Sequence, residues 1–467
     1  MKMWSGRFCG SLDPAFEQWQ RSFPFDRRLL LHELEASAAH AGALKQVGIL
    51  SSHELAAIQN GLKQIADDAF HSAGFLDDDE AEDVHHFVEK KLVSSIGDLG
   101  YKLHSGRSRN EQIAADLRLY VREGIDRLVL LLSDWIEVLL SRAGASGDAV
   151  VPSYTHLQPA EPVLVAHWLL AYVEMFLRDA DRLSDCRKRV NLCPLGSGAV
   201  AGATLDLDRA AMAHELGFQA PTANSVDATS DRDFAIEFVN GLSLLAVHLS
   251  RWSEEMLLFS TGEYGFLQLP ESYLTGSSAM PQKKNPDLLE LVRGKAGRVV
   301  GDLTSLLVTT KGLPLAYNKD LQETQEPLFH ATETVLAVLP LVIGWMTDVQ
   351  FNYSRMRQAC DSGMMNAFAA ATYLAKKGVP SRLAHEMVGN AVRLCIEKGC
   401  DLQDLSLAEF RAFSSEFEND VYECLTLPAV LAMHNVRGGT APERVRAAMA
   451  DAQQRASKLR GEAHAHA

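Results

Sequence analysis

The chain has 467 residues, of which 47% are hydrophobic and 22% charged, and this is the composition of an ordinary soluble globular protein. The formal net charge is −15, and no basic run is longer than Arg187-Lys188-Arg189. Sequence-independent binding to nucleic-acid backbones is therefore not expected. Seven scattered cysteines without a Cys-x-x-Cys pair indicate neither a disulfide framework nor a zinc site. No apolar stretch that we recognise is long enough to span a membrane, and no signal peptide is evident. We therefore expect a reduced, cytoplasmic protein without nucleic-acid or membrane partners.

Helical patterns dominate the chain, and strand-like alternation is rare. The segment before residue 105 is broken by turns and holds the acidic run 77–83, and beyond residue 350 the expected helices shorten again. Between them the periodicity predicts five long helices, some of them apolar on nearly every side, which favours a bundle that packs against copies of itself. The expected ranges are 111–143, 163–190, 230–262, 287–312 and 327–348, the last with a kink at Pro340.

The predicted fold is therefore mainly α, with a central bundle of five long helices flanked by two smaller, mostly helical domains. We place the N-terminal domain at residues 1–105, the central bundle at 106–350 and the C-terminal domain at 351–467. An oligomer is expected, because a single bundle has too little interior for so many apolar helix faces.

Three polar loops each precede the expected start of a long helix: residues 104–110, 153–159 and 276–286. Helix N-termini favour anions, so loops that meet would form a cationic pocket suited to a polycarboxylate. The third loop, with adjacent serines, a lysine pair and Asn285-Pro286, resembles a catalytic loop. If Ser277 or Ser278 is a base, lowering its pKa by five units requires roughly 7 kcal/mol. One lysine cannot supply that alone.

Each of these residues also has a purely structural interpretation. Ser108 with Glu111 fits a capping box, and Asn285 is expected to cap a helix that begins at Pro286. Lys283 can be one of a solvated pair, and a lone loop histidine such as His156 is structural more often than catalytic. The acidic run lacks compact metal-ligand spacing, so we expect a solvated loop and neither metal nor cofactor.

Several motifs together resemble those of the argininosuccinate lyases in the aspartase/fumarase superfamily, over residues 4 to about 450. The signature loop Gly276-Ser277-Ser278-Ala279-Met280-Pro281-Gln282-Lys283-Lys284-Asn285-Pro286 is matched in its Gln-Lys-Lys form. Further matches are Trp4-Ser5-Gly6-Arg7-Phe8, Glu82-Asp83-Val84-His85, Gly106-Arg107-Ser108-Arg109-Asn110, Tyr154-Thr155-His156-Leu157-Gln158, Ser230-Asp231-Arg232-Asp233 and Leu315-Ala316-Tyr317-Asn318-Lys319-Asp320.

The resemblance implies cofactor-free β-elimination of argininosuccinate to arginine and fumarate, in arginine biosynthesis, by a homotetramer with shared active sites. It implies Ser277 as the base and His156 as the acid, with Lys283 stabilising the dianionic intermediate. The expected ligands of the fumarate-side carboxylates, besides Lys283, are Ser108, Asn110, Thr155 and Asn285, and Arg109 adds positive charge to the same pocket. On the arginine side the implied contacts are Ser22, Tyr317 and Gln322. The resemblance also implies that the segment with Asp83 and His85 approaches the substrate, so these two are further candidates.

The chain departs from the family pattern at a few positions. Gln325 stands where many members carry a lysine that is thought to help hold the substrate, and Glu33 and Ala36 stand where the family often has aspartate and glycine. Two alternatives therefore stay open. One is a related lyase that releases fumarate from a different N-succinyl compound, which Gln325 favours. The other is a structural protein on a lyase scaffold, such as a lens crystallin, which the intact Ser277, His156 and Lys283 oppose.

Overall fold

The computed structural model describes residues 12–464, so the Trp4 to Phe8 match lies outside the described residues. Helices make up 68% of the chain, and the described strands form four small two-stranded sheets. The expectation of a mainly α protein is confirmed.

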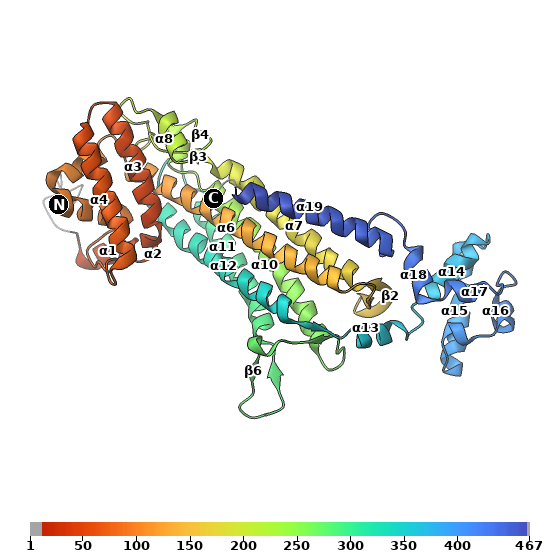
Figure 1. Ribbon diagram of the computed structural model, residues 1–467. Coiled ribbons are helices and arrows are strands. Elements are labelled where there is room, and N and C mark those ends of the chain that lie inside the picture. Colours follow the sequence, from red (N-terminus) through yellow and green to blue (C-terminus); the bar gives the residue numbers. More distant parts are fainter. Residues whose placement is uncertain (1–11, 465–467) are drawn as a thin grey trace. The chain divides into compact units, whose positions relative to one another are not determined.

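All five predicted long helices are present, with ends within three residues of the expected ones. They are α6 (Arg109–Ala145), α7 (Val165–Val190), α10 (Asp233–Ser260), α11 (Asp287–Thr310) and α12 (Gln325–Asp348) (Figure 1). Pro340 lies inside α12, in its second half.

Packing divides the chain into two compact units, and each long helix contributes one part to each unit. Unit 1 contains Met1–Arg127, Arg182–Ser243 and Gly297–Val335; unit 2 contains Leu128–Asp181, Leu244–Ala296 and Leu336–Ala467. This division does not follow sequence order, so the three domains 1–105, 106–350 and 351–467 remain a prediction.

Unit 1 combines its parts of the long helices with the N-terminal helices. The Tyr120 ring of α6 packs edge-on against Phe329 of α12, with centroids 5.0 Å apart, and Phe23 stacks on Phe87 at 4.8 Å. Such aromatic pairs stabilise a core by about 0.5–1.5 kcal/mol beyond the area they bury. The other elements of unit 1 are α1 (Pro14–Trp19), α2 (Phe23–Asp26), η2 (Arg27–Leu29), α3 (Leu30–Gln46), α4 (Ser52–His71), α5 (Val84–Ile96), η3 (Gly97–His104), β3 (Leu192–Cys193), α8 (Arg209–Glu215), β4 (Ala220–Pro221), α9 (Ser225–Ala228) and η5 (Lys319–Thr324).

Unit 2 is held by a chain of tryptophans across three of the long helices. Trp252 of α10 contacts Trp135 of α6 and Trp345 of α12 edge-to-face, at centroid distances of 5.1 and 5.2 Å. All three side chains are fully buried. The other elements of unit 2 are β1 (Val150–Thr155), β2 (Gln158–Leu164), β5 (Leu267–Gln268), η4 (Glu271–Tyr273), β6 (Thr275–Gly276), β7 (Lys284–Asn285), β8 (Gln350–Phe351), α13 (Tyr353–Cys360), α14 (Ala367–Lys376), α15 (Ser381–Lys398), η6 (Leu402–Asp404), α16 (Leu407–Phe413), α17 (Val421–Cys424), α18 (Leu427–Met433) and α19 (Pro442–His464).

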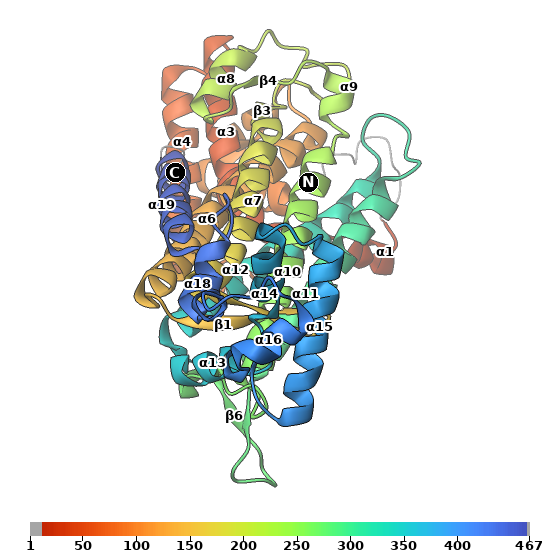
Figure 2. The ribbon, with the colours of Figure 1, turned by 90° about the vertical axis from the view of Figure 1, so that its right-hand side faces the viewer.

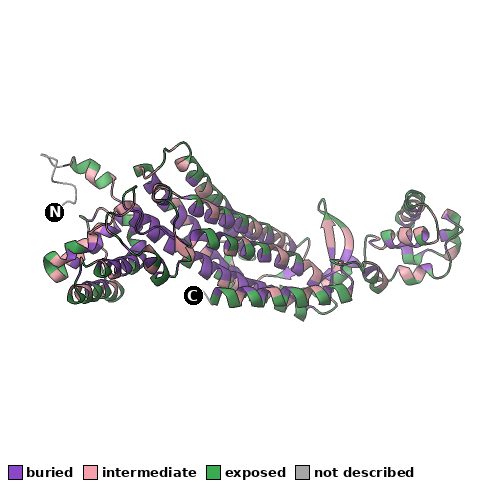
Figure 3. Cartoon of the chain, turned by 90° about the horizontal axis from the view of Figure 1, so that it is seen from above, coloured by how far each residue is buried: buried purple, intermediate pink, exposed green. Residues whose placement is uncertain are grey.

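Helices α14 to α17 enclose a small core of their own inside unit 2. Figure 2 labels three of them, α14, α15 and α16. The core includes Phe410, whose ring lies 4.8 Å from that of Phe417, and Leu374 and Val388 are buried in the same cluster. Figure 3 shows buried residues along the long helices and again among these shorter ones.

Two helical segments, Asp233–Ser260 and Lys319–Asp348, are long and apolar enough to cross a membrane by length and composition alone, contrary to the expectation from the sequence. In each, 56% of the apolar window is buried inside the structure. Core helices of soluble proteins pass the same test, so this is weak evidence for a membrane segment.

Candidate active site

The third loop forms a hairpin of unit 2 in which β6 pairs with β7 in antiparallel fashion, Thr275 opposite Asn285 (Figure 1). Between the strands, the Ser277 hydroxyl oxygen accepts hydrogen bonds from the backbone N–H groups of Ala279 (3.3 Å) and Met280 (3.0 Å). Ser277 is half-buried, whereas Ser278 is exposed. Two backbone dipoles therefore point at Ser277, and this arrangement stabilises negative charge on its oxygen.

The two lysines of this loop differ in their surroundings. Lys284 pairs with Glu271, whereas the Lys283 side chain makes no hydrogen bond or ion pair within residues 12–464. The expected capping by Asn285 is not found: its side chain donates to Thr275 and to the Gly276 carbonyl, each at 3.4 Å, and α11 begins at Asp287. Lys283 is thus the free cation of the loop as the structure describes it.

The second loop, residues 153–159, includes the turn of a hairpin between β1 and β2 in unit 2, which the sequence did not predict. Thr155 pairs with Gln158, which leaves His156 and Leu157 as a two-residue turn with φ of 55° and 58°. Such turns match the twist of the flanking strands but require positive φ at both positions. The His156 side chain is exposed and has no hydrogen-bond partner among the described residues. The hairpin thus presents Thr155 and His156 at its tip.

The first loop leads into α6 in unit 1. The Ser108 N–H donates to Glu111 at 3.1 Å, but the Ser108 hydroxyl accepts from Asn110 N–H at 3.3 Å, so only the glutamate half of the predicted capping box forms. Glu111 also accepts from Gly198 N–H at 2.9 Å. The Asn110 side chain donates to the Ala199 carbonyl. These contacts tie the helix start to the loop around residue 198.

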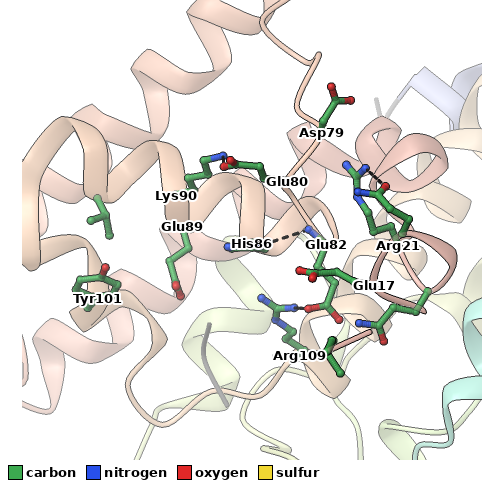
Figure 4. A pocket seen from close by; sticks show the side chains of 14 residues that line it. Glu17, Arg21, Asp79, Glu80, Glu82, His86, Glu89, Lys90, Tyr101 and Arg109 are labelled. Atoms are coloured by element: carbon green, nitrogen blue, oxygen red, sulfur yellow. Dashed lines mark hydrogen bonds and ion pairs between the residues drawn. The ribbon is translucent and has the colours of Figure 1, made fainter. Parts of the chain in front are cut away.

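Arg109, the first residue of α6, is held by an acidic partner. Its Nη1 lies 2.6 Å from Asp83 Oδ2 and 3.8 Å from Glu82 Oε2. Arg109 lines a cavity of about 540 Å³ together with Arg21, Glu82 and His86 (Figure 4), a size suited to a small-molecule ligand. Of the binding residues expected from the sequence, Arg109 alone lines this cavity.

Ser22, expected on the arginine side, is buried at the start of α2. Its hydroxyl donates to Asp26 Oδ2 at 2.6 Å, and Asp26 Oδ1 accepts from Val84 N–H at 3.0 Å. Burial, reinforced by the charge of Asp83, raises the pKa of Asp26 to about 7. Asp26 is a titrating neighbour of Ser22 that no sequence motif indicated.

The Asp26→Asn variant should remove a pH-dependent loss of stability. The folded-state pKa of about 7 lies above the unfolded value of 3.8, so stability is fully present near pH 4 and is lost as pH rises through 7, by on the order of 2–4 kcal/mol. Thermal unfolding midpoints of both proteins at pH 5 and pH 8 measure this. We expect Asp26→Asn to gain relative to the parent chain at pH 8, and an equal difference at both pH values would contradict it.

Tyr317, Gln322 and Gln325 lie in unit 1, around η5. Burial and the nearby Asp83 and Glu82 raise the pKa of Tyr317, although Arg232 opposes the shift. Gln322 donates to the Gln20 carbonyl at 3.1 Å. Gln325 is 4% exposed, and its Oε1 has no hydrogen-bond partner among the described residues. An unpaired buried amide oxygen of this kind costs about 1–3 kcal/mol.

Replacing Gln325 by lysine should lower KM for argininosuccinate by roughly tenfold, because a charge-assisted hydrogen bond to a carboxylate is stronger than a neutral one by about 1–2 kcal/mol. The Gln325→Met variant, which has similar volume and no charge, is the control. The KM values of both variants, from steady-state kinetics, show whether the charge of the lysine or only the change of side chain matters. If KM is unchanged in Gln325→Lys while the protein stays folded, the missing charge does not matter for binding.

The expected site residues thus fall into two groups. Unit 2 contains the proposed catalytic residues His156, Ser277 and Lys283, together with the proposed binding residues Thr155 and Asn285. Unit 1 carries the remaining proposed binding residues, which are Ser22, His85, Ser108, Arg109, Asn110, Tyr317, Gln322 and Gln325.

One buried cluster has the residue types of a metal site. Suitable ligand atoms of Glu33, His85 and Asp116 lie within 4.8 Å of one another. However, Glu33 already accepts hydrogen bonds from Ser37, Gln112 and His85, and Arg107 Nη2 lies 3.8 Å from Glu33 Oε1. A cation would compete with these donors and face the guanidinium charge, so the cluster suits a hydrogen-bond network better than a metal.

Comparison with known proteins first identifies the class of enzyme to which the chain belongs. Residues 6–301 match the family model described as "Lyase", and residues 364–432 match "Argininosuccinate lyase C-terminal". The structure resembles an EDDS lyase in complex with formate, at 27% identity and a TM-score of 0.83 over 98% of this chain and 93% of that one. It also shares the fold of a class II fumarase from Schistosoma mansoni, at 16% identity and a TM-score of 0.74 over 87% and 91% of the chains. The protein is a lyase with the aspartase/fumarase fold.

The curated relatives identify the family within this class of lyases. The argininosuccinate lyase of Koribacter versatilis is 60% identical over 449 residues, which is 96% of each chain. That of Acidobacterium capsulatum is 56% identical over 98% of this chain and 96% of its own. The chain belongs to the argininosuccinate lyase family.

Proposed function

We propose that this protein cleaves argininosuccinate to arginine and fumarate in the cytoplasm, as a step of arginine biosynthesis. Within a chain of this family, the observation that carries the proposal is the β6–β7 loop, where two backbone N–H groups point at the Ser277 oxygen and Lys283 is free. These are the features that a serine base in an elimination requires.

The reaction would begin when Ser277, as an alkoxide, removes a proton from the carbon next to a carboxylate of the succinyl group. The electron pair moves into that carboxylate and gives an enediolate-like dianion, which Lys283 stabilises. The pair then returns to form the carbon–carbon double bond while the C–N bond breaks. His156 donates a proton to the departing guanidine nitrogen, so that fumarate and arginine leave.

Two backbone hydrogen bonds reduce the free energy that Lys283 must supply to lower the pKa of Ser277. A hydrogen bond to a charged group contributes about 1.5–3 kcal/mol and one to a neutral group about 0.5–1.5 kcal/mol, so the bonds from Ala279 and Met280 favour the alkoxide over the hydroxyl by roughly 2–3 kcal/mol. Lowering the serine pKa by five units requires about 7 kcal/mol. Lys283 then needs to provide only the remainder.

The remaining predicted residues would bind the substrate. Ser108, Asn110, Thr155 and Asn285 would hold the fumarate-side carboxylates and Arg109 would add positive charge. Ser22, Tyr317 and Gln322 would surround the arginine side, and His85 and Gln325 are further candidates for substrate contact. The reaction requires no metal or organic cofactor in this scheme, because every proton and electron pair is handled by side chains.

The active form would be a homotetramer whose active sites draw loops from more than one subunit. Large apolar side chains stay exposed on three long helices of the single chain, and such exposed apolar surface marks contact sites. Their exposed fractions range from 36% to 59%: Leu244, Val247, Leu291, Val300, Leu307, Val308 and Leu341. Sedimentation of the purified protein tests this, and a monomer at micromolar concentration would contradict it.

A second candidate is a lyase that releases fumarate from a different N-succinyl compound. The neutral, buried Gln325 favours it, and a solved EDDS lyase variant at 27% identity carries bound fumarate. The structural-protein alternative has less support, because Ser277 and Lys283 keep the arrangement that chemistry needs.

An assay for fumarate, by its ultraviolet absorbance, distinguishes these candidates. The purified protein is incubated separately with argininosuccinate, adenylosuccinate and aspartate. We expect fumarate from argininosuccinate alone. Fumarate only from another compound would favour the second candidate, and none from any would favour a structural role.

A further inference from the structure

The hairpin that carries Ser277 and Lys283 projects from the rest of unit 2 (Figure 1). Each of its strands, β6 and β7, is two residues long. A two-stranded hairpin is at best marginally stable by itself, so its direction depends on contacts at its base. The position of the Ser277 oxygen therefore depends on residues outside the turn in which it lies.

The polar contacts of this segment are local. Thr275 Oγ1 donates to Asp287 Oδ2 at 2.6 Å, and Lys284 pairs with Glu271. Within residues 12–464, no hydrogen bond or ion pair links residues 270–286 to a long helix other than α11, which follows the hairpin directly. Among the described residues these polar contacts thus tie the hairpin only to its neighbours in sequence.

Tyr273 makes a contact with a different long helix, α12. It lies in η4, two residues before β6, and its half-buried side chain lies against the α12 backbone at Gly344. A Cβ added at Gly344 would overlap the Tyr273 hydroxyl oxygen and would lie 3.3 Å from Cζ. The phenol therefore occupies the space that a side chain at position 344 would need.

The glycine at position 344 is explained by this contact and not by its backbone. Gly344 lies inside α12 and does not have a positive φ. In a helix interior, glycine is less favourable than every other residue except proline. A Cβ added at Gly389, inside α15, would in contrast meet nothing within 4 Å. Gly344 thus allows the close approach of Tyr273.

We propose that Tyr273 is a positioning residue for Ser277: its ring, packed against α12 at Gly344, fixes the base of the hairpin and thereby sets where the Ser277 oxygen and Lys283 lie. This inference rests on the proposed function. Catalytic groups must be held closely, since a displacement of about 1 Å can lower a rate by about 10²-fold. Tyr273 acts through the hairpin and is assigned no contact with the substrate.

The test is the Gly344→Ala variant and its rescue by Tyr273→Phe. The added methyl group displaces the Tyr273 ring, so kcat should fall by about 10–100-fold. In the double variant the overlapping oxygen is absent, so kcat should return to the value of Tyr273→Phe alone. Gly389→Ala, which adds the same methyl group to a helix where it meets no neighbour, should match the parent chain.

Trypsin gives a second measurement that does not depend on turnover. The rate of cleavage after Lys283 and Lys284, followed by mass spectrometry, should rise in Gly344→Ala, because a released hairpin opens more often. It should fall back in the double variant. If Gly344→Ala does not fold, Tyr273→Ala, which leaves α12 unchanged, should show both the lower kcat and the faster cleavage.

A merely structural Gly344 would lower the thermal unfolding midpoint without changing the kcat of the folded protein. Parent values of kcat and of the cleavage rate in Gly344→Ala, or losses that Tyr273→Phe does not relieve, would overturn the proposal. If the parent chain does not cleave argininosuccinate, the proposed function fails, whereas the trypsin rates still show whether Tyr273 holds the hairpin.

Discussion

The Ser277→Ala variant should lose turnover by about 10²–10⁴-fold while its fold and assembly stay intact, because this is what proton transfer by a positioned group contributes. The loop is exposed and its strand pairing uses backbone groups, so removing one hydroxyl leaves the hairpin in place. Single-turnover kinetics and equilibrium binding of argininosuccinate measure the two effects separately, and we expect the dissociation constant to change little.

Ser278→Ala is the matched control for this experiment, since Ser278 is exposed and adjoins Ser277. Its kcat should stay within a few-fold of the parent value. If Ser278→Ala were the inactive variant, or if Ser277→Ala retained near-normal turnover, the base would have to be assigned to another residue.

The Lys283→Met variant should lower kcat by roughly 10²–10³-fold, because a charge aimed at a developing dianion is worth about 3–4 kcal/mol in the transition state. Lys283 makes no ion pair within the described part of the chain, so its removal breaks no contact there. Steady-state kinetics at saturating argininosuccinate report the loss.

Lys284→Met provides the comparison, because Lys284 carries the same charge on the same loop but is paired with Glu271. We expect a change of less than about threefold, since exposed ion pairs are worth little. Equal losses in both lysine variants would show that the net charge of the loop matters and not the position of Lys283.

The long helices were predictable because apolar periodicity and end signals extend over many residues. α6 begins two residues before its expected start and α10 ends two residues early, within the usual uncertainty of helix ends. The fold class followed from these helices. The β1–β2 hairpin was not predicted, because its strands contain prolines and its His156-Leu157 turn lacks the glycine or asparagine that marks such turns.

The candidate site was predictable only in part. Motifs indicated Ser277 and Lys283, but not that backbone N–H groups point at the Ser277 oxygen, which depends on the detailed path of the loop. Asn285 was expected as a cap and instead bonds across the hairpin. The contact of Glu33 with His85 joins residues 52 positions apart on two helices, and no local pattern encodes it.

In the proposed homotetramer each active site would combine residues of more than one subunit, and complementation between variant chains tests this most directly. Differently tagged Ser277→Ala and Arg109→Gln chains are first assayed alone to establish that each is inactive, and they are then co-expressed and the doubly tagged hybrids isolated. If sites are shared between subunits, random assembly restores about one quarter of the parent activity, because a site is intact when both contributing subunits carry the parent residue. Hybrids as inactive as either variant would contradict the shared site.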